Sequence, residues 1–303
     1  MSDQMFCYQC QEAAGCKGCT IKGVCGKQPD TAALQDAQIY ALKGLASVAE
    51  AVGTTAAADA AGQLALYGLF ETVTNTNFDN VRFVLRIGEI IALRDKLAAE
   101  LPEGTELPTC AAWAPTCEAD MLAAAAQTSV LATENEDVRS LRELLMYGIK
   151  GMAAYAEHAV VLGHTDPLID AFLVKALASM VKDLSVDEMV ALVLEAGSVS
   201  VTTMALLDTA NTSTFGDPEL TEVNLGVGTN PGILVSGHDL LDIKELLEQT
   251  EGTGVDVYTH GEMLPSHYYP ELKKFSHLVG NYGGAWYKQA KEFASFNGPI
   301  LMT

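Results

Sequence analysis

Cysteine placement is the feature that most constrains this chain, because most of its cysteines are gathered at one end. Five of the seven lie within the first 25 residues, namely Cys7, Cys10, Cys16, Cys19 and Cys25. Disulfides rarely persist in a reducing compartment, so such a cluster is more typical of a metal site than of a covalent framework. We therefore expect this segment to hold metal.

The spacing of these cysteines separates two kinds of metal site. Cys7 and Cys10 share one tight turn, and Cys19 and Cys25 follow after eight and five intervening residues. Four thiolates suit either tetrahedral zinc or a cubane iron-sulfur cluster. A zinc ribbon separates its cysteine pairs by about 15 to 20 residues, whereas only five residues lie between Cys10 and Cys16. The spacing therefore favours iron-sulfur over structural zinc, but it does not rank Cys16 against Cys19.

Composition excludes some classes of protein. The chain has 303 residues, 49% of them hydrophobic, so it can bury a sizeable core and is long enough for two domains. A formal net charge of -21 repels nucleic acid and anionic lipid. No uninterrupted run reaches the roughly 18 apolar residues of a spanning helix, and residues 1–4 lack the basic start of a secretory signal. We expect a soluble, cytoplasmic protein.

Helical periodicity dominates residues 1–217. Apolar residues recur three or four apart over about 34–52, 78–97 and 138–163, as one buried helix face requires. Asp166 before Pro167 predicts one further helix start, and Ser185 with Glu188 forms a capping box that predicts another. Three prolines in residues 101–117 predict an irregular connection. We expect a mainly α N-terminal domain over 1–217.

The pattern changes near residue 218. Short apolar runs at 232–236, 254–258 and 298–302 alternate with helical stretches at about 240–249 and 285–294. This alternation predicts a parallel sheet in a Rossmann-like α/β domain over 218–303. A sheet this small leaves open edges, which favours pairing with further strands. We therefore expect the α/β domain to be incomplete in this chain.

Three other features have ordinary interpretations. Cys110 and Cys117 lie in the proline-rich connection and are predicted to be buried or free thiols. His260 and His267 lie in a polar loop, where surface exposure is the expected state and proton transfer the alternative. The glycine-rich residues 226–232 precede a strand instead of following one, so they do not predict a dinucleotide site.

Several segments resemble the hybrid-cluster protein family, whose members are also called prismane proteins or hydroxylamine reductases. The start of the chain carries MFCYQCQE at 5–12, GCTIKGVCGK at 18–27 and TAALQD at 31–36. Later segments that are similar to that family are PGILVSGHDL at 231–240, GVDVYTHGEMLP at 254–265 and GPILMT at 298–303. The helices between them fit in order and length. The resemblance therefore covers the whole chain and is most specific at its two ends.

The resemblance implies two metal centres. Cys7, Cys10, Cys19 and Cys25 match the ligands of a [4Fe-4S] cubane, which leaves Cys16 as the spare cysteine. His238 and Glu262 match two ligands of a hybrid iron-sulfur-oxygen cluster, at which family members reduce hydroxylamine to ammonia and water. The implied fold is a set of three-helix bundles followed by Rossmann-like domains related to carbon monoxide dehydrogenase.

Taken without the resemblance, the two candidate catalytic residues have simpler interpretations. His238 precedes a predicted helix and is typical of a helix start, and a lone glutamate such as Glu262 is usually solvated. Both follow predicted strands, however, where open α/β sheets place their ligand crevices. Our hypothesis is that an N–O substrate binds there and receives two electrons relayed from the cubane. A ferredoxin-like protein or a nicotinamide-dependent reductase is the expected electron donor.

The chain departs from the family in length. Family members continue for about as long again, and that second half supplies several cysteines and another glutamate of the hybrid cluster. We expect this chain to be the N-terminal part of a longer enzyme. Two alternatives are an electron-transfer protein without catalysis, which predicts iron but no turnover, and a carbon monoxide dehydrogenase-like enzyme, which predicts nickel.

Overall fold

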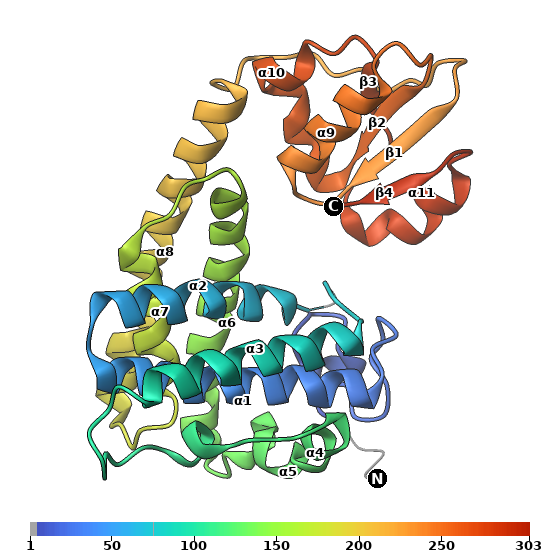
Figure 1. Cartoon of the computed structure of the whole chain (residues 1–303). Coiled ribbons are helices and arrows are strands. Elements are labelled where there is room, and N and C mark those ends of the chain that lie inside the picture. The colour runs from blue at the N-terminus through green and yellow to red at the C-terminus, as the bar shows by residue number, and fades with distance from the viewer. Residues whose placement is uncertain (1–4, 75) are drawn as a thin grey trace. The chain divides into compact units, whose positions relative to one another are not determined.

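The computed structural model describes residues 5–74 and 76–303, which form a helix-rich part and a small α/β part (Figure 1). The chain divides into two compact units, Met1–Glu157 with Thr165–Ala205, and His158–His164 with Leu206–Thr303. We call these the helical unit and the α/β unit. Residues 1–4, on which the expectation of no signal sequence rests, lie outside the described residues.

Helix α1 (Pro29–Val52) is the centre of the helical unit. Its side chains Leu34 and Ala37 are 0% exposed and Gln35 is 1% exposed, and because Gln35 and Ala37 point in nearly opposite directions the helix is buried on more than one face. It packs against α2 (Thr55–Glu71), α3 (Asn80–Ala98) and α7 (Pro167–Ser179). Such burial explains why α1 carries alanine and glycine on several sides, because close helix neighbours leave little room for larger side chains.

One glycine shows how closely these helices approach. A Cβ added to Gly62 of α2 would lie 2.5 Å from the Cβ and 2.6 Å from the Cα of Asp170 in α7. No real Cβ contact is that short, so α2 and α7 meet backbone to backbone at this point. Glycine lowers the stability of a helix, but here it allows the close packing of α2 against α7.

The predicted helix starts are confirmed. The side chain of Asp166 accepts a hydrogen bond from the backbone N–H of Leu168 at 2.9 Å. Ser185 N–H donates to the Glu188 carboxylate at 2.8 Å, and Glu188 N–H donates to Ser185 Oγ at 3.3 Å, which is the reciprocal capping box. Residues 101–117 form an irregular connection, as predicted, apart from one short 3-10 helix within it. The remaining helices of this region are η1 (Ala14–Cys16), η2 (Thr109–Ala112), α4 (Glu118–Ala123), α5 (Ala125–Thr128), η3 (Val130–Ala132), α6 (Glu136–Val161) and α8 (Val186–Phe215).

The α/β unit holds one parallel sheet in the order β3-β2-β1-β4. Its strands are β1 (Gly232–Ser236), β2 (Asp256–His260), β3 (Leu278–Asn281) and β4 (Ile300–Met302). Its helices are α9 (Leu240–Thr250), η4 (Gly261–Tyr268), α10 (Pro270–Lys273), η5 (Trp286–Lys288) and α11 (Gln289–Ser295). The parallel sheet is confirmed, whereas the sequence did not predict β3.

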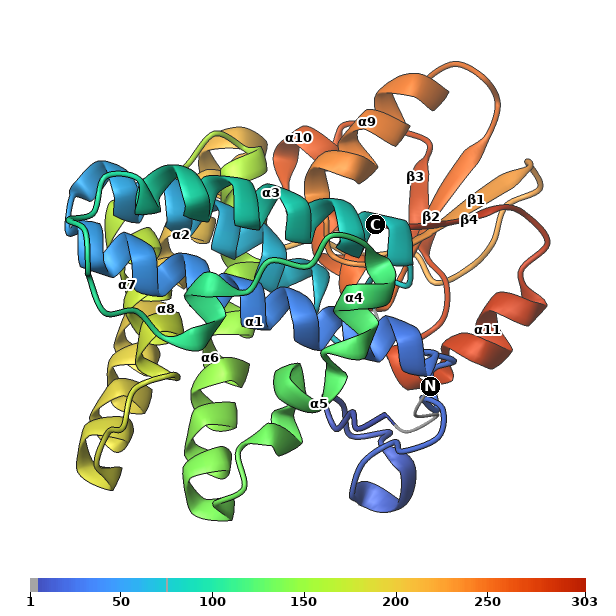
Figure 2. The same ribbon diagram turned by 60° about the horizontal axis from the view of Figure 1, so that its bottom comes forward.

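The two faces of the sheet meet different helices (Figure 2). Val235 and Val257 are both 0% exposed and join a core that includes Ile243 of α9. Tyr258, next along β2, turns to the other face, where its ring packs 6.2 Å from that of Phe296, just after α11. The order reversal at β1 places α9 and α11 on opposite faces, as right-handed crossovers require.

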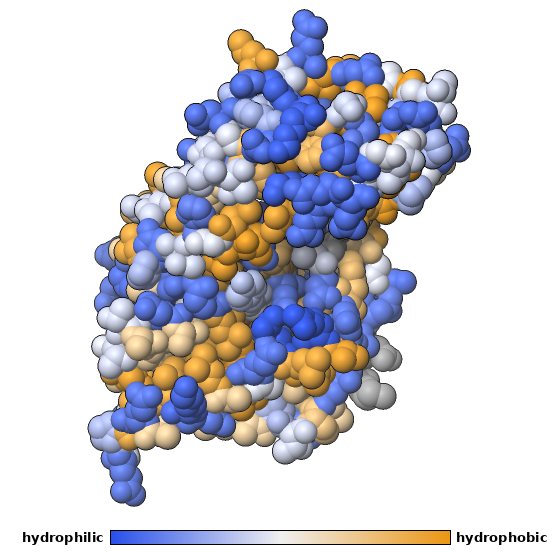
Figure 3. All heavy atoms as spheres, turned by 45° about the horizontal axis from the view of Figure 1, so that its top comes forward, coloured by the Kyte–Doolittle hydropathy of each residue, from blue (hydrophilic) through white to orange (hydrophobic). Residues whose placement is uncertain are grey.

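Helix α8 is long and apolar enough to cross a membrane by length and composition alone. One such helix is weak evidence for a membrane span, and only 17% of its apolar window is buried among the described residues. Apolar residues also reach the surface elsewhere, as Figure 3 shows on a face where they lie among hydrophilic ones. Scattered apolar exposure of this kind is normal for folded proteins.

Candidate metal-binding sites

The cysteine segment folds back on itself through one backbone bridge. Cys7 N–H donates to the Cys19 carbonyl at 3.0 Å, and Cys19 N–H donates to the Cys7 carbonyl at 2.7 Å. The backbone N–H of Ala14 points at Cys19 Sγ at 3.5 Å. Two cysteines that lie twelve positions apart are thus held side by side, although no strand of normal length is present there.

The five cysteines differ in exposure and backbone conformation. Cys19 is buried, Cys7 is half-buried, and Cys10, Cys16 and Cys25 are exposed; all are free thiols. Cys16 has a φ of 56°, a left-handed conformation that side chains other than glycine rarely adopt. Cys16 therefore occupies a tight turn and is exposed, whereas Cys19 is buried. The structure thus distinguishes the two cysteines, which the spacing in the sequence did not rank.

Lys27 places a buried positive charge beside this segment. Its side chain is 1% exposed, and its ammonium donates to Gln35 Oε1 at 2.7 Å and lies 3.7 Å from Cys7 Sγ. A buried cation is costly unless a negative charge accompanies it. Among the described residues no carboxylate forms an ion pair with Lys27, and the sulfur of Cys7 is a partner within reach of its ammonium.

Glycine keeps space open around a second cysteine. A Cβ on Gly23 would lie 3.1 Å from Cys25 Sγ and 3.0 Å from the Lys27 side chain. Gly23 N–H also donates to the Lys27 carbonyl at 2.8 Å, which closes the loop around Cys25. With the buried ammonium and the free thiols, this geometry fits an anionic cluster bound by cysteine.

Two tyrosines anchor the segment to α6. Tyr147 donates to the Tyr8 carbonyl at 2.7 Å, and Tyr8 donates to Glu143 Oε2 at 2.7 Å. Burial, together with the nearby charges of Cys7 and Cys10, raises the pKa of Tyr147 to about 12. Burial and Glu143 also raise the pKa of Tyr8. Both phenols therefore stay protonated and keep donating near neutral pH.

The second candidate site lies at the carboxyl ends of β1 and β2. Ser236 is opposite His260 in the parallel register, and His238 and Glu262 each follow their strand by two residues. The register thus places His238 and Glu262 at the same edge of the sheet, where such folds bind ligands. Among the described residues, no hydrogen bond or ion pair joins the two side chains to each other.

The backbone at His238 is fixed from both sides. His238 N–H and Asp239 N–H both donate to Thr303 Oγ1 at 3.0 Å. The Asp239 carboxylate caps α9 by accepting from Leu241 N–H at 2.7 Å and lies 3.7 Å from His158 Nδ1. The His238 side chain is exposed, yet desolvation by the surrounding protein lowers the pKa of its imidazole, and Glu262 opposes that shift. His238 is therefore neutral near pH 7, as a metal ligand must be.

The interpretation of His260 and His267 as surface residues is wrong. His260 is 0% exposed because it is the last residue of β2, and His267 is 6% exposed because η4 packs it onto the sheet. His260 contacts Ser236 Oγ at 3.1 Å and Glu292 Oε2 at 2.8 Å, and His267 contacts Thr259 Oγ1 at 2.8 Å. The polar residues around His260 and His267 suggested exposure, whereas both side chains are buried and have hydrogen-bond partners.

The two thiols outside the cysteine segment agree with prediction. Cys110 is buried and Cys117 is exposed, and both are free. Burial raises the pKa of the Cys110 thiol, which favours its unreactive protonated form. Residues 226–231 precede β1, as predicted, and so fail the position required of a dinucleotide loop.

The fold and these sites define a cysteine-rich helical protein with an attached parallel α/β sheet. The sequence profile of the Prismane/CO dehydrogenase family matches residues 5–303. The chain belongs to that family, which confirms the resemblance found at the two ends of the sequence.

Curated relatives cover nearly the whole chain. It is 55% identical over 307 residues to the hydroxylamine reductase of Clostridium perfringens, 57% over 311 residues to that of Nitratidesulfovibrio vulgaris and 58% over 306 residues to that of Desulfitobacterium hafniense. Each match covers 99% of this chain and 56% of the relative. The chain thus spans little more than half the length of these relatives.

A solved structure, carbon monoxide dehydrogenase IV from Carboxydothermus hydrogenoformans, matches 93% of this chain and 43% of its own. The sequence identity is 13% and the TM-score is 0.30. A TM-score this low carries no argument about the fold or the function of this chain.

Proposed function

We propose that this chain forms the N-terminal part of a hydroxylamine reductase, which reduces hydroxylamine or a related N–O species such as nitric oxide. The observation that carries the proposal is the identity of 55 to 58% over nearly the whole chain to proteins of that name. For hydroxylamine, two electrons and two protons cleave the N–O bond and give one ammonia and one water. The α/β unit then corresponds to part of a Rossmann-like domain that further strands complete.

The cysteine segment is the proposed site of a [4Fe-4S] cluster, with Cys7, Cys10, Cys19 and Cys25 as its ligands. The bridge between Cys7 and Cys19 supports this assignment, because it holds two of the four ligands at a fixed separation. The buried Lys27 ammonium offsets the negative charge of the thiolates. When bound, this cluster would supply single electrons, and a hybrid cluster would supply an iron with an open position for the substrate.

His238 and Glu262 are the proposed ligands that this chain contributes to the hybrid cluster. The lowered pKa of His238 keeps its imidazole neutral, so a lone pair is free for iron. Glu262 adds a carboxylate from the neighbouring strand end, and carboxylates change their mode of binding readily. The remaining ligands are proposed to lie in the part of the relatives that this chain does not span.

A separate electron-donor protein, ferredoxin-like or a nicotinamide-dependent reductase, is the proposed partner. The position of residues 226–231 before β1 supports this, because no glycine-rich loop follows that strand to hold a dinucleotide. Other N–O substrates, including nitrosylated thiols, fit the same reducing chemistry.

Iron content is the first test. Anaerobically purified 303-residue chain is expected to hold about four irons and no zinc. In the full-length protein, His238→Ala and Glu262→Ala should each abolish turnover of hydroxylamine while the signal of the cubane survives. Glu245→Ala, on the exposed face of α9, is the matched control and should retain activity. Zinc in place of iron, or full activity in His238→Ala, contradicts the proposal.

An electron-transfer protein without catalysis is the second candidate. The observation that favours it is that this chain carries four candidate cubane ligands but only two candidate ligands of the hybrid cluster. An assay of the full-length protein distinguishes the two candidates. A pure electron carrier would hold reducible iron but would not turn over hydroxylamine.

A further inference from the structure

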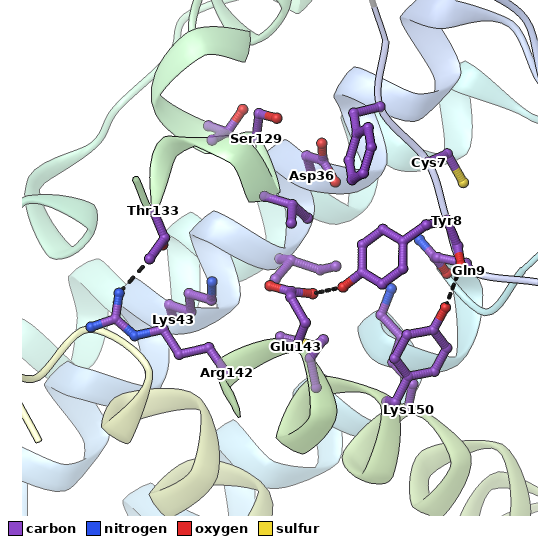
Figure 4. A pocket seen from close by; sticks show the side chains of 16 residues that line it. Cys7, Tyr8, Gln9, Asp36, Lys43, Ser129, Thr133, Arg142, Glu143 and Lys150 are labelled. Carbon is purple, nitrogen blue, oxygen red and sulfur yellow. Dashed lines mark hydrogen bonds between the residues drawn. The ribbon is translucent and has the colours of Figure 1, made fainter. Parts of the chain in front are cut away.

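A cavity of about 50 Å³ lies within the helical unit, between α1, α6, the region of η3 and residues 6–9 (Figure 4). Its wall is unusually rich in charged side chains: Asp36 and Lys43 come from α1, and Arg142, Glu143 and Lys150 come from α6. The proposed function uses none of these five. A cavity of this polarity inside a helical core requires a physical explanation, because apolar residues could fill the space at lower cost.

Two of the five charged groups have partners in the protein. Glu143 accepts a hydrogen bond from the Tyr8 hydroxyl at 2.7 Å. Arg142 donates to the Lys182 carbonyl at 3.0 Å and to Thr133 Oγ1 at 3.4 Å. Their charges are thus held by direct hydrogen bonds.

The other three charged groups have no such partner. The ammoniums of Lys43 and Lys150 and the carboxylate of Asp36 form no hydrogen bond or ion pair with any residue that the structure describes. Lys150 is only 6% exposed. Burial lowers the pKa of Lys150 to about 8, although the charges of Asp36 and Glu143 oppose that shift, so polar contents of the cavity would stabilise its ammonium.

The size of the cavity limits what it can hold. One water needs about 10 to 15 Å³ measured in this way, so 50 Å³ has room for about three to five water-sized atoms. That is the number of heavy atoms in nitrate, bicarbonate or phosphate.

The charge of the wall favours an anion. Three cationic side chains face two carboxylates, and one of those carboxylates, Glu143, is already hydrogen-bonded to Tyr8. Burial raises the pKa of Asp36 to about 7, although the Lys150 charge opposes that shift, so Asp36 is partly neutral at neutral pH. Burial lowers the pKa of Lys43 as well, so an anion in the cavity would favour the charged forms of both lysines.

The cavity is distinct from the cysteine site. Cys7 contributes to the wall, but Figure 4 shows its sulfur pointing away from Asp36 and Lys43. We propose that this cavity binds one small oxyanion, with the ammoniums of Lys43 and Lys150 as its principal contacts. The inference goes beyond the proposed function and does not depend on it, because no iron ligand is needed to hold the anion.

Calorimetric titration of the anaerobically purified chain with phosphate, nitrate and bicarbonate tests the proposal, with chloride at equal ionic strength as the reference. At least one of the three oxyanions should bind at one site per chain. Lys150→Met and Lys43→Met should each weaken that binding ten-fold or more, since each removes a charge-assisted hydrogen bond. Asp36→Asn should tighten it several-fold, because it removes a negative charge from the wall.

Lys96→Met is the matched control, because Lys96 is exposed on α3 and its loss changes the net charge equally. Binding by that variant should stay within two-fold of the parent. Circular dichroism without anion checks that each variant is folded, and the opposite effect of Asp36→Asn guards against loss of binding through unfolding. Absence of binding by all three oxyanions, or equal affinities in Lys150→Met and Lys96→Met, would mean that the cavity holds only water and overturns the proposal.

Discussion

The Lys27 ammonium lies 3.7 Å from Cys7 Sγ, and the lysine side chain is 1% exposed. A fixed cation at this distance stabilises negative charge on the sulfur more strongly than a solvated one does. It also stabilises the reduced form of any cluster bound to Cys7, because reduction adds one negative charge. The sequence does not distinguish Lys27 from Lys22, which lies on the same segment but is exposed.

Lys27→Met is expected to make the midpoint potential of the proposed cubane about 40 mV more negative, which corresponds to about 1 kcal/mol for one electron. The physical reason is loss of the buried charge beside Cys7. Potentiometry followed by electron paramagnetic resonance measures the shift. Lys22→Met, which removes an exposed lysine from the same segment, should shift it by far less; equal shifts would show that Lys27 acts only through net charge.

Cys16 and Cys19 are expected to differ sharply when each is replaced. Cys19→Ser should lose most of the iron, because Cys19 is buried and bridged to Cys7. Cys16→Ser should retain about four irons, because Cys16 lies exposed in a left-handed turn. Iron and sulfide analysis of the purified variants measures both. Loss of iron in Cys16→Ser alone would reverse the assignment of the spare cysteine.

Gly62→Ala should lower the free energy of unfolding by about 2 kcal/mol, because the new methyl would lie 2.5 Å from the Asp170 side chain. Gly88→Ala is the matched control in α3, since nothing lies within 4 Å of a Cβ there. It should raise the free energy of unfolding by about 0.5 to 1 kcal/mol through better helix propensity. Urea denaturation measures both, and equal effects would contradict the close approach of α2 and α7.

Asp36 should make stability depend on pH between about 4 and 7. Burial raises the pKa of Asp36 in the folded chain from the ordinary 3.8 to about 7, so the folded state binds its proton more tightly than the unfolded state. The free energy of unfolding then falls as pH rises through this window. Asp36→Asn removes that dependence, so the variant should gain at least about 1 kcal/mol relative to the parent between pH 4.5 and 7.5. Urea denaturation at both pH values measures the gain, and a constant difference would contradict the raised pKa.

The elements that the sequence predicted are those whose signals are local. Asp166 and Ser185 mark helix starts because a cap needs only a side chain and the N–H groups two or three residues away. Strand β1 was predictable because its five residues are mostly apolar and β-branched or aliphatic. Strand β3 was not, since it has four residues, includes Gly280 and is defined by pairing with β2. Helix α2 is rich in alanine and gives no contrast between faces.

The candidate sites divide in the same way. The cysteine spacing is a local signal, and it located the segment that the backbone bridge between Cys7 and Cys19 holds together. The Lys27 contact and the charged cavity were not predicted. Lys43 and Lys150 lie on different helices and meet only through packing of α1 against the region of α6, which no short pattern encodes. Burial of His260 likewise depends on α11, which covers that end of β2.

Thr303→Val tests whether the turn at His238 is held by the hydroxyl of Thr303, which accepts from both His238 N–H and Asp239 N–H. Valine keeps the shape and removes the acceptor, so the turn should loosen while the Asp239 cap keeps α9 in place. In the full-length protein we expect turnover of hydroxylamine to fall about ten-fold, since a displacement of about 1 Å is enough for a large loss of rate. The cubane signal should be unchanged. Thr221→Val removes an exposed hydroxyl whose one hydrogen bond among the described residues is to the Glu219 carbonyl, so it should leave turnover at the parent value. Equal turnover in the two variants would show that Thr303 does not position His238.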